Sequence, residues 1–301
     1  MGTWGASLYD DDAASDLKKS IALISKVPVD GHQLLELLEQ RQGNTDPDDV
    51  DGYLFWLVVA DQFEKLGIES RRAASIALRI IESGTDIATC KAKGADEKFL
   101  KARQKTLSEL AARLRQPRPL KVKSKPKKPP PLVLSTGEVF AFPTMAGRAW
   151  HPYRLPSAGP FIADGWGALV VLATGRAYGW LPWVALASLT VPPDIKPTFD
   201  SALDGQLIPH PQTYGAGRFV PKPSHVKGLR LELLGTIDLD PSLVTPHLSK
   251  WKIEDAIAFD WSVAYGALST TLVGNGATAG VILKSLCRNA GPPGFRGEPT
   301  T

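Results

Sequence analysis

The sequence contains few of the residues that build metal, redox and catalytic sites. Only two of its 301 residues are cysteines, Cys90 and Cys287, and they lie too far apart for a metal-binding or redox spacing. We expect Cys90 at the end of a helix and Cys287 in a tail, without a disulfide, as in a reducing compartment. The histidines form no helical pair and no other metal-ligand spacing; they are His32, His151, His210, His225 and His247. No metal ion is expected.

Motifs for phosphate and dinucleotide cofactors are missing as well. The sequence contains no Gly-Lys-Ser or Gly-Lys-Thr, and residues 274–280 lack the third glycine of a dinucleotide fingerprint at the required spacing. The pair Asn275-Gly276 is instead typical of a hairpin turn. We therefore expect no cofactor and no enzymatic activity. An unrecognised hydrolase stays open as an alternative, because catalytic triads assemble from residues that are distant in sequence.

The sequence also lacks the signals of secretion and membrane insertion. The first twelve residues contain no basic side chain, whereas a signal peptide begins with one. Residues 261–283 carry no charge and could span a bilayer by length. Glycines and the Asn-Gly turn interrupt them, so that we expect two buried strands. These features favour a cytoplasmic protein that does not contact a membrane.

Neither sign of charge dominates the sequence as a whole, because acidic and basic regions largely cancel and leave a net charge of +4. Residues 1–64 hold 13 acidic and 4 basic side chains, and residues 65–115 hold 6 acidic and 12 basic ones. Residues 116–131 add 6 basic side chains and no acidic one. The excess of positive charge therefore comes from a helical segment and a linker, whereas a nucleic-acid-binding fold would concentrate it on one folded face.

The composition changes along the chain in a way that predicts two domains. Residues 1–115 show helical spacing, and residues 116–131 form a basic linker with six prolines, which favour an extended chain. Short apolar runs between glycines and prolines predict a β-rich domain over 132–287. A disordered tail is expected over 288–301. The predicted fold class is α+β, with a helical N-terminal domain and a mainly antiparallel β domain at the C-terminal side.

Periodicity and capping residues predict the individual helices. A helix from Pro47, capped by Asp46, should end at Gly67, and its apolar residues 53–60 should be buried on all sides. Ser70 should cap the next helix, with Gly84 as a left-handed stop. The remaining expected helices span 16–26, 32–42 and 96–114, with a short one within 243–257. The expected strands span 138–142, 168–173, 178–183, 229–237 and 268–273.

Three groups of polar or aromatic residues are candidates for function. Asp10, Asp11 and Asp12, with Asp16, could bind a basic partner or a metal ion or, alternatively, mark the start of a helix, where carboxylates meet free backbone N–H groups. The polar residues Asp61 and Gln62 follow a strongly apolar stretch and must find hydrogen bonds, which favours a structural role over a catalytic one.

The third candidate group consists of tryptophans in the segment Gly179-Trp-Leu-Pro-Trp183. Tryptophan side chains often anchor protein interfaces. We expect Trp180 or Trp183 to point outward and contact a protein partner, although core packing is the simpler alternative.

The N-terminal 90 residues resemble a bacterial family that is defined by the domain of unknown function 4259. The resemblance is carried by Met1-Gly-Thr-Trp-Gly-Ala-Ser-Leu-Tyr-Asp-Asp-Asp-Ala13, by Leu54-Phe-Trp-Leu-Val-Val-Ala-Asp61 followed by Lys65-Leu-Gly67, and by Ala77-Leu-Arg-Ile-Ile-Glu-Ser-Gly84. It implies a domain but no activity.

The C-terminal domain resembles the immunity protein 26 family of bacterial toxin systems. Gly137-Glu-Val-Phe-Ala-Phe-Pro143 is similar to the first strand of that family, and Leu231-Glu-Leu-Leu-Gly-Thr-Ile237 is similar to a later one. A longer Trp- and Pro-rich stretch follows Pro143, and residues 185–215 have no counterpart. The resemblance implies a small β-rich domain that neutralises a cognate toxin by binding it.

These observations lead to two hypotheses of binding. The first is a non-catalytic immunity protein of a toxin–antitoxin or polymorphic toxin system, whose acidic N-terminal region attracts a basic toxin or effector. The alternative is a nucleic-acid-associated defence or regulatory protein that uses the basic helix and linker. The linker contains no aromatic residue for base stacking, which favours the first hypothesis.

Overall fold

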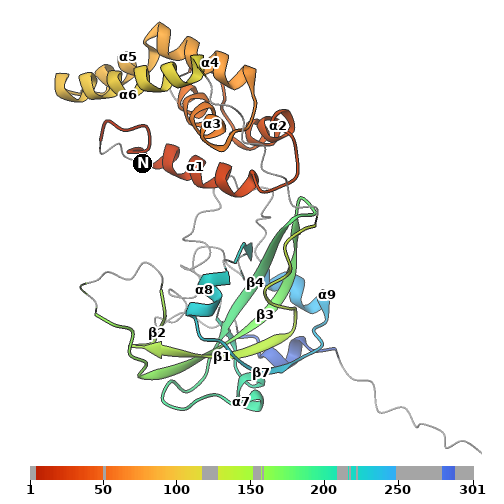
Figure 1. Ribbon diagram of the computed structural model, residues 1–301. Helices are drawn as coiled ribbons and strands as arrows, with labels where there is room; N and C mark the ends of the chain where they lie inside the picture. The colour runs from red at the N-terminus through yellow and green to blue at the C-terminus, as the bar shows by residue number, and fades with distance from the viewer. Residues whose placement is uncertain are drawn as a thin grey trace, which may run out of the picture. The chain divides into compact units, whose positions relative to one another are not determined.

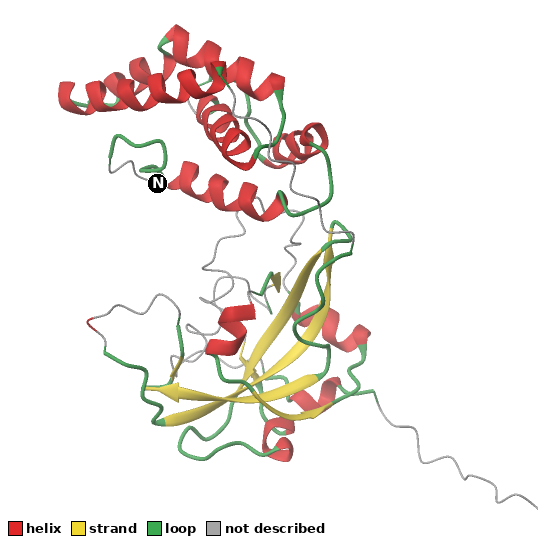
Figure 2. Ribbon diagram, viewed as in Figure 1, coloured by secondary structure: helices red, strands yellow, loops and turns green. Residues whose placement is uncertain are grey.

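The computed structural model of the chain describes residues 5–49, 52–116, 128–151, 157, 159–208, 216, 218–221, 223–248 and 280–288 (Figure 1). These residues form two compact units, of which the first contains the described residues up to Pro130 together with Ala177–Leu181, and the second contains the other described residues. Residues 5–116 are helical and are called the helical unit, and residues 131–288 contain an antiparallel sheet and are called the β unit (Figure 2). The predicted α+β class is confirmed. Most of the predicted linker and the tail over 289–301 lie outside the described residues.

One central helix organises the helical unit. The helices are α1 (Asp12–Ile24), α2 (Gly31–Arg41), α3 (Tyr53–Leu66), α4 (Arg71–Ser83), α5 (Thr85–Ala92) and α6 (Glu97–Arg115). Helix α3 packs against α1, α4, α5 and α6. Its large side chains Phe55, Trp56 and Phe63 are at most 2% exposed. A helix that is apolar on all sides is stable in water only when neighbours surround it, and α3 confirms the prediction.

Local capping defines several helix ends as predicted. The Ser70 hydroxyl accepts a hydrogen bond from the Ala73 amide at 3.2 Å at the start of α4. Gly67 and Gly84 end α3 and α4 with φ of 69° and 72°, a left-handed conformation that side chains other than glycine rarely adopt. Asp96 caps α6 by accepting from the Phe99 amide at 2.7 Å.

The prediction that Pro47 opens a helix is wrong. The carboxylate of Asp46 accepts a hydrogen bond from the Asp48 amide at 3.0 Å, which closes a turn instead of capping a helix. The turn folds back so closely that a Cβ atom on Gly52 would lie 2.0 Å from the Asp46 carbonyl oxygen. Helix α3 therefore begins only at Tyr53. Helix α5 was not predicted, since it is short and nearly without an apolar stripe.

The β unit is built on one antiparallel sheet. Its strands are β1 (Glu138–Met145), β2 (Arg148–Ala149), β3 (Gly165–Ala177), β4 (Leu181–Leu189), β5 (Leu207–Ile208), β6 (Arg218–Phe219) and β7 (Glu232–Thr236). The order is β2-β1-β3-β4-β5, with β6 beside β4 and β7 beside β1. The short helices are α7 (Phe199–Leu203), α8 (Pro223–Gly228) and α9 (Pro241–Val244), followed by the 3-10 helices η2 (Thr245–His247) and η4 (Leu283–Leu286).

Both faces of the sheet are apolar, because the strands alternate between two buried clusters. One cluster includes Val139, Val170, Leu172 and Ala185. The other includes Phe140, Phe142, Leu169 and Val184. Helices α7, α9 and η4 supply side chains to the first cluster, and residues at the end of α8 supply side chains to the second. The sheet is therefore the middle layer of its unit.

Several strand predictions need correction. Residues 178–180 form a turn between β3 and β4, because Tyr178 and Gly179 adopt φ of 52° and 64°. Cys287 does not lie in a tail, since it forms a β-bridge with Leu239. The expected strand over 268–273 and the turn at Asn275-Gly276 lie outside the described residues. A short helix does occur near 243, as α9 and η2, but it begins at Pro241.

Within the described ranges, no helix combines the length and the apolar character that crossing a bilayer requires. Most of the uncharged stretch over 261–283 falls outside those ranges.

Candidate functional site

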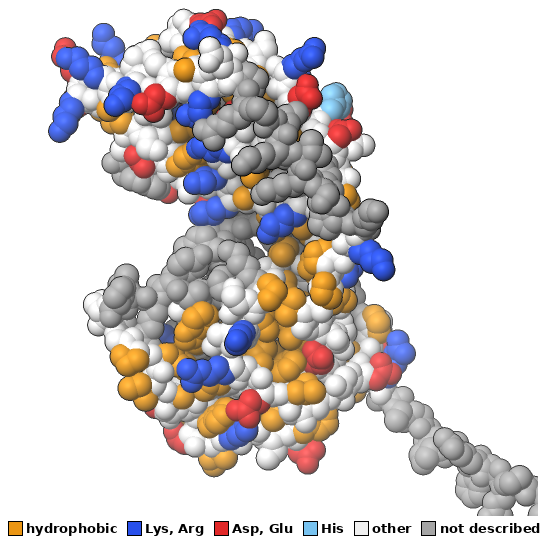
Figure 3. All heavy atoms as spheres, viewed as in Figure 1, with side chains coloured by type: hydrophobic (Ala, Val, Ile, Leu, Met, Phe, Trp, Pro, Cys, Tyr) orange, Lys and Arg blue, Asp and Glu red, His pale blue; other side chains and the backbone are white. Residues whose placement is uncertain are grey.

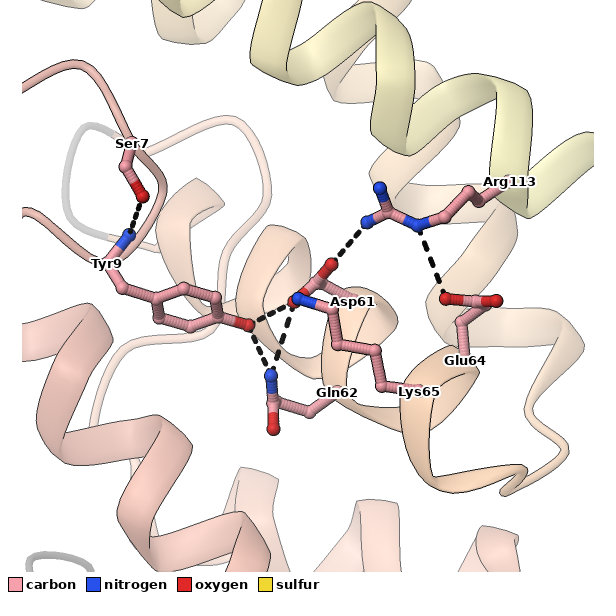
Figure 4. Close-up of polar contacts among 7 residues, drawn as sticks. All are labelled: Ser7, Tyr9, Asp61, Gln62, Glu64, Lys65 and Arg113. Atoms are coloured by element: carbon pink, nitrogen blue, oxygen red, sulfur yellow. Dashed lines mark hydrogen bonds and ion pairs between the residues drawn. The ribbon is translucent and has the colours of Figure 1, made fainter.

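The most elaborate polar arrangement in the helical unit surrounds the buried carboxylate of Asp61 on α3 (Figure 4). The Tyr9 hydroxyl and the Lys65 ammonium both donate to Asp61 Oδ2, the latter at 2.7 Å. Gln62 Nε2 donates to the Tyr9 hydroxyl at 2.5 Å. Arg113 of α6 donates to Asp61 Oδ1 at 2.5 Å. The side chain of Asp61 is only 3% exposed, so that these donors replace its lost hydration.

The electrostatics of this Asp61 cluster favour a structural role. Arg113 Nε also contacts Glu64 at 3.3 Å, so that one guanidinium serves two buried carboxylates. The ammonium groups of Lys18 and Lys65 lie 4.5 and 5.3 Å from the centre of the Tyr9 ring. Burial of Tyr9, with the hydrogen bond to Asp61 and its charge, raises the pKa of the phenol well above its usual range. Tyr9 therefore stays protonated near neutral pH, whereas a general base must be deprotonated before it can accept a proton from a substrate.

A second buried ion pair links α5 and α6. Arg103 donates to both oxygens of Asp86, from Nε at 2.9 Å and from Nη2 at 2.7 Å. Its third hydrogen bond, from Nη1, reaches the Ser7 carbonyl oxygen at 2.9 Å. The side chains of Arg103 and Asp86 are 4% and 0% exposed. Burial opposes the charged guanidinium, but hydrogen bonds and the charge of Asp86 outweigh it, so that the pKa of Arg103 is raised.

Both buried clusters hold the same segment, residues 5–11, which precedes α1. Arg103 binds it at the Ser7 carbonyl, and Asp61 and Gln62 bind it at the Tyr9 hydroxyl. The hydrogen bonds expected for Asp61 and Gln62 are therefore confirmed. Sequence reasoning missed Tyr9, Arg113 and the pair Asp86–Arg103. These residues and their partners lie 17 to 96 residues apart, and no spacing rule relates residues at such separations in sequence.

The acidic residues at the start of α1 make local hydrogen bonds. The side chain of Asp11 accepts from the Ala14 amide at 3.1 Å and caps α1, as the alternative interpretation predicts. Asp10 accepts from the Ser7 amide at 2.9 Å, and Asp12 lies in the first turn of the helix. All three side chains are half-buried. Contact between these residues and a partner stays a prediction.

The two tryptophans that were singled out for an interface are mostly packed within the protein. Trp180 is 9% exposed. Trp183 is half-buried against the core of the β unit, and a Cβ atom on Gly175 would lie 2.5 Å from its ring. The guanidinium of Arg218 lies 5.3 Å from the centre of the same ring. A large part of each ring therefore serves packing, and a role in partner binding stays a prediction.

The histidine and cysteine side chains that the structure describes include His32, His151, Cys90 and Cys287. His32 lies on the surface of α2, 79% exposed and 3.5 Å from Glu36. His151 follows β2, where burial lowers the pKa of its imidazole. The thiols of Cys90 and Cys287 are free, as expected. Within the described part of the chain, no group of three or more His, Cys, Asp or Glu side chains could hold a metal ion.

Exposed apolar side chains are concentrated in the β unit, which contributes five of the six large ones among the described residues. The six are Leu66, Leu132, Ile162, Ile195, Leu233 and Leu243. Leu233 is 58% exposed and lies on β7. Among the described residues, β1 is the only strand that pairs with β7, so that within these ranges the other edge of β7 (the open edge) has no partner strand. The carboxylate of Glu232, next along this edge, pairs with the ammonium of Lys196.

Comparisons with known proteins add no relative: no family model, no curated protein and no solved structure matches the chain.

Proposed function

We propose that this protein is a non-catalytic immunity-type protein of the bacterial cytoplasm, which binds and neutralises a cognate toxin or effector. The single observation that carries the proposal is the open edge of β7 with the exposed side chain of Leu233. An unpaired strand edge offers a row of backbone donors and acceptors to an extended segment of another chain. The same strand lies within the segment that resembles the immunity protein 26 family.

The features of β7 favour pairing with a specific partner over uncontrolled association between copies of this chain. The strand has five residues and a bulge where its register with β1 shifts between Val139 and Phe140. Short length, a bulge and the ion-paired Glu232 are features that limit uncontrolled edge pairing. Leu233, the second residue of β7, is an exception, because its large apolar side chain is 58% exposed and offers apolar surface to a partner beside the edge.

The charge of the helical unit supports attraction of a basic partner. Residues 30–49 hold six acidic side chains and one basic side chain, Arg41. Two of the six are partly neutralised by α4, since Arg72 binds Glu39 at 2.7 Å and Arg79 lies 3.5 Å from Asp48. Asp30, Glu36 and Asp46 are exposed. Such a surface increases the association rate with a positively charged protein at low ionic strength.

A rescue assay tests the function. The chain is co-expressed with the product of the adjacent gene, and growth of the host is followed. We expect the adjacent product to arrest growth and this chain to restore it. An adjacent product that is harmless, or that stays toxic beside the wild-type chain, contradicts the immunity function.

A pair of variants tests the surface. Leu233→Lys places a charge on the open edge of β7, and Leu243→Lys makes the same change on α9, where the side chain is 44% exposed. We expect Leu233→Lys to abolish rescue and Leu243→Lys to retain it, because a lysine on an edge strand disfavours pairing with another chain. Equal rescue by both variants would leave the immunity function in place and exclude the β7 edge as its surface.

A further inference from the structure

The end of α5 and the first half of α6 carry a concentration of exposed lysines. Residues 91–105 contain five of them, and all five are exposed: Lys91, Lys93, Lys98, Lys101 and Lys105. Figure 3 shows Lys and Arg side chains gathered where α5 and α6 meet. The exposed carboxylates in the same stretch are Asp96, which caps α6, and Glu97.

Three of these lysines lie on one side of α6. Lys98, Lys101 and Lys105 are three and four residues apart, which places them within one stripe of an α-helix. At a rise of about 1.5 Å per residue, the stripe extends along about 10 Å of the helix axis. One strand of a nucleic-acid duplex advances by about 3.4 Å per phosphate, so that the stripe matches about three phosphates.

The cations of α6 differ in their environments, and Arg115 at its end is exposed and pairs with Glu82 at 2.8 Å. Arg103 and Arg113 face the bundle and form ion pairs with Asp86, Asp61 and Glu64. Lys98, Lys101 and Lys105 face solvent, and among the described residues none of the three has an acidic side chain within ion-pair distance. Internal ion pairs therefore do not neutralise the exposed set.

We propose that this lysine face, formed by Lys91, Lys93, Lys98, Lys101 and Lys105, binds the phosphate backbone of a nucleic acid. Charge identifies the ligand, because five exposed ammonium groups with two neighbouring carboxylates attract a dense polyanion. The face adjoins the N-terminal end of α6, whose dipole adds positive potential. Six basic residues follow in the chain over 116–131. The proposal is independent of the β7 edge and of the immunity function.

The lysine face predicts binding without sequence preference. Lysines contact phosphates as point charges, whereas bases are read by bidentate or stacking side chains. The aromatic side chain of this segment, Phe99, is half-buried, and the exposed residues of 91–105 are small or charged apart from Gln104. Duplexes of different sequence should therefore bind with equal affinity at one salt concentration.

Fluorescence anisotropy with the full-length chain and a labelled 20-base-pair DNA duplex tests the proposal. Five phosphate contacts predict a slope of log K against log salt of about −4.5, and thus about 500-fold weaker binding at 200 mM than at 50 mM salt. The variant Lys98→Gln/Lys101→Gln/Lys105→Gln should reduce the size of the slope by about 2.7. The matched control Lys26→Gln/Arg148→Gln/Lys227→Gln removes the same net charge from other exposed sites.

The outcomes separate this site from general charge effects. A slope that falls in the triple lysine variant, and falls by less than about one unit in the control, supports the lysine face. No binding of the wild-type chain at 50 mM salt overturns the proposal. Equal losses in both variants overturn it as well, since they assign binding to net charge or to residues 116–131. Binding to phosphatidylserine vesicles but not to DNA or RNA would assign the face to a membrane and overturn it too.

Discussion

The buried pair Asp86–Arg103 provides the sharpest test of how the helical unit is held together. Replacing Arg103 with Met removes three hydrogen bonds, two to Asp86 and one to the Ser7 carbonyl oxygen. The carboxylate of Asp86, which is 0% exposed, then stays inside the protein without a counter-charge. The loss of unfolding free energy in this variant should therefore be far larger than the net contribution that one ion pair makes to stability.

The magnitude follows from desolvation. Breaking a buried ion pair by removing one partner costs about 3–5 kcal/mol, against a total stability of about 5–15 kcal/mol for a domain. Replacing both partners, as in Asp86→Ala/Arg103→Met, removes the buried charge and should recover most of the loss. A residual deficit of about 1–2 kcal/mol is expected, because the double variant still lacks the hydrogen bond to the Ser7 carbonyl oxygen and the carboxylate in the first turn of α5, near the positive end of its dipole.

Urea unfolding of the full chain, followed by circular dichroism at 222 nm, measures these free energies, because most helical residues belong to the helical unit. Arg103→Lys is the conservative control, and it should fall between wild type and Arg103→Met, because a lysine cannot form the two-pronged contact with Asp86. A double variant that is as unstable as Arg103→Met would refute the explanation by an unpaired buried charge. It would assign the loss to packing or to the Ser7 contact.

The remaining predictions concern the segment before α1 and the packing of Trp183. Tyr9→Phe keeps the ring beside Lys18 and Lys65 and removes the hydroxyl, which should cost about 1.5–3 kcal/mol for a hydrogen bond to a charged group. The pKa of Tyr9 is raised in the folded state, so its contribution is complete below the unfolded value of about 10 and declines as the pH rises above it. Stability measured from pH 9 to 12 should therefore fall less steeply in Tyr9→Phe than in wild type, and parallel curves would contradict the assignment. Gly175→Ala should destabilise the β unit by about 1–3 kcal/mol, since the added methyl group would lie 2.5 Å from the Trp183 ring. Thermal unfolding measures this loss. The double variant Gly175→Ala/Trp183→Leu should lose less stability than the sum of the losses in its two single variants.

Local signals were sufficient to predict much of the helical unit. The extent of α4 follows from a capping serine and a left-handed glycine, and the burial of α3 follows from an apolar run without a polar face. Pro47 was misleading because a proline fits the start of a helix and a turn equally well. The structure shows the turn, in which the Asp46 carboxylate accepts from the Asp48 amide and the Asp46 carbonyl approaches Gly52 closely.

The buried clusters and the sheet edge could not be predicted in the same way. Asp61 follows an apolar stretch, and its need for partners was therefore visible in the sequence, but Tyr9 and Arg113 lie 52 residues away on either side. Likewise, the apolar run around β7 predicts a strand but not its neighbours. That β1 is the only partner of β7 among the described strands, and that Leu233 is exposed, depends on the order of strands in the sheet.

The central claim is that the protein acts by binding a toxin through the open edge of β7. Isothermal titration of the purified adjacent gene product into the full-length chain tests it most directly. We expect saturable binding with a dissociation constant on the order of nanomolar, a binding free energy of about −12 kcal/mol, which Leu233→Lys weakens and Leu243→Lys does not. Absence of binding at micromolar concentrations, or equal affinities for wild type and Leu233→Lys, would contradict it.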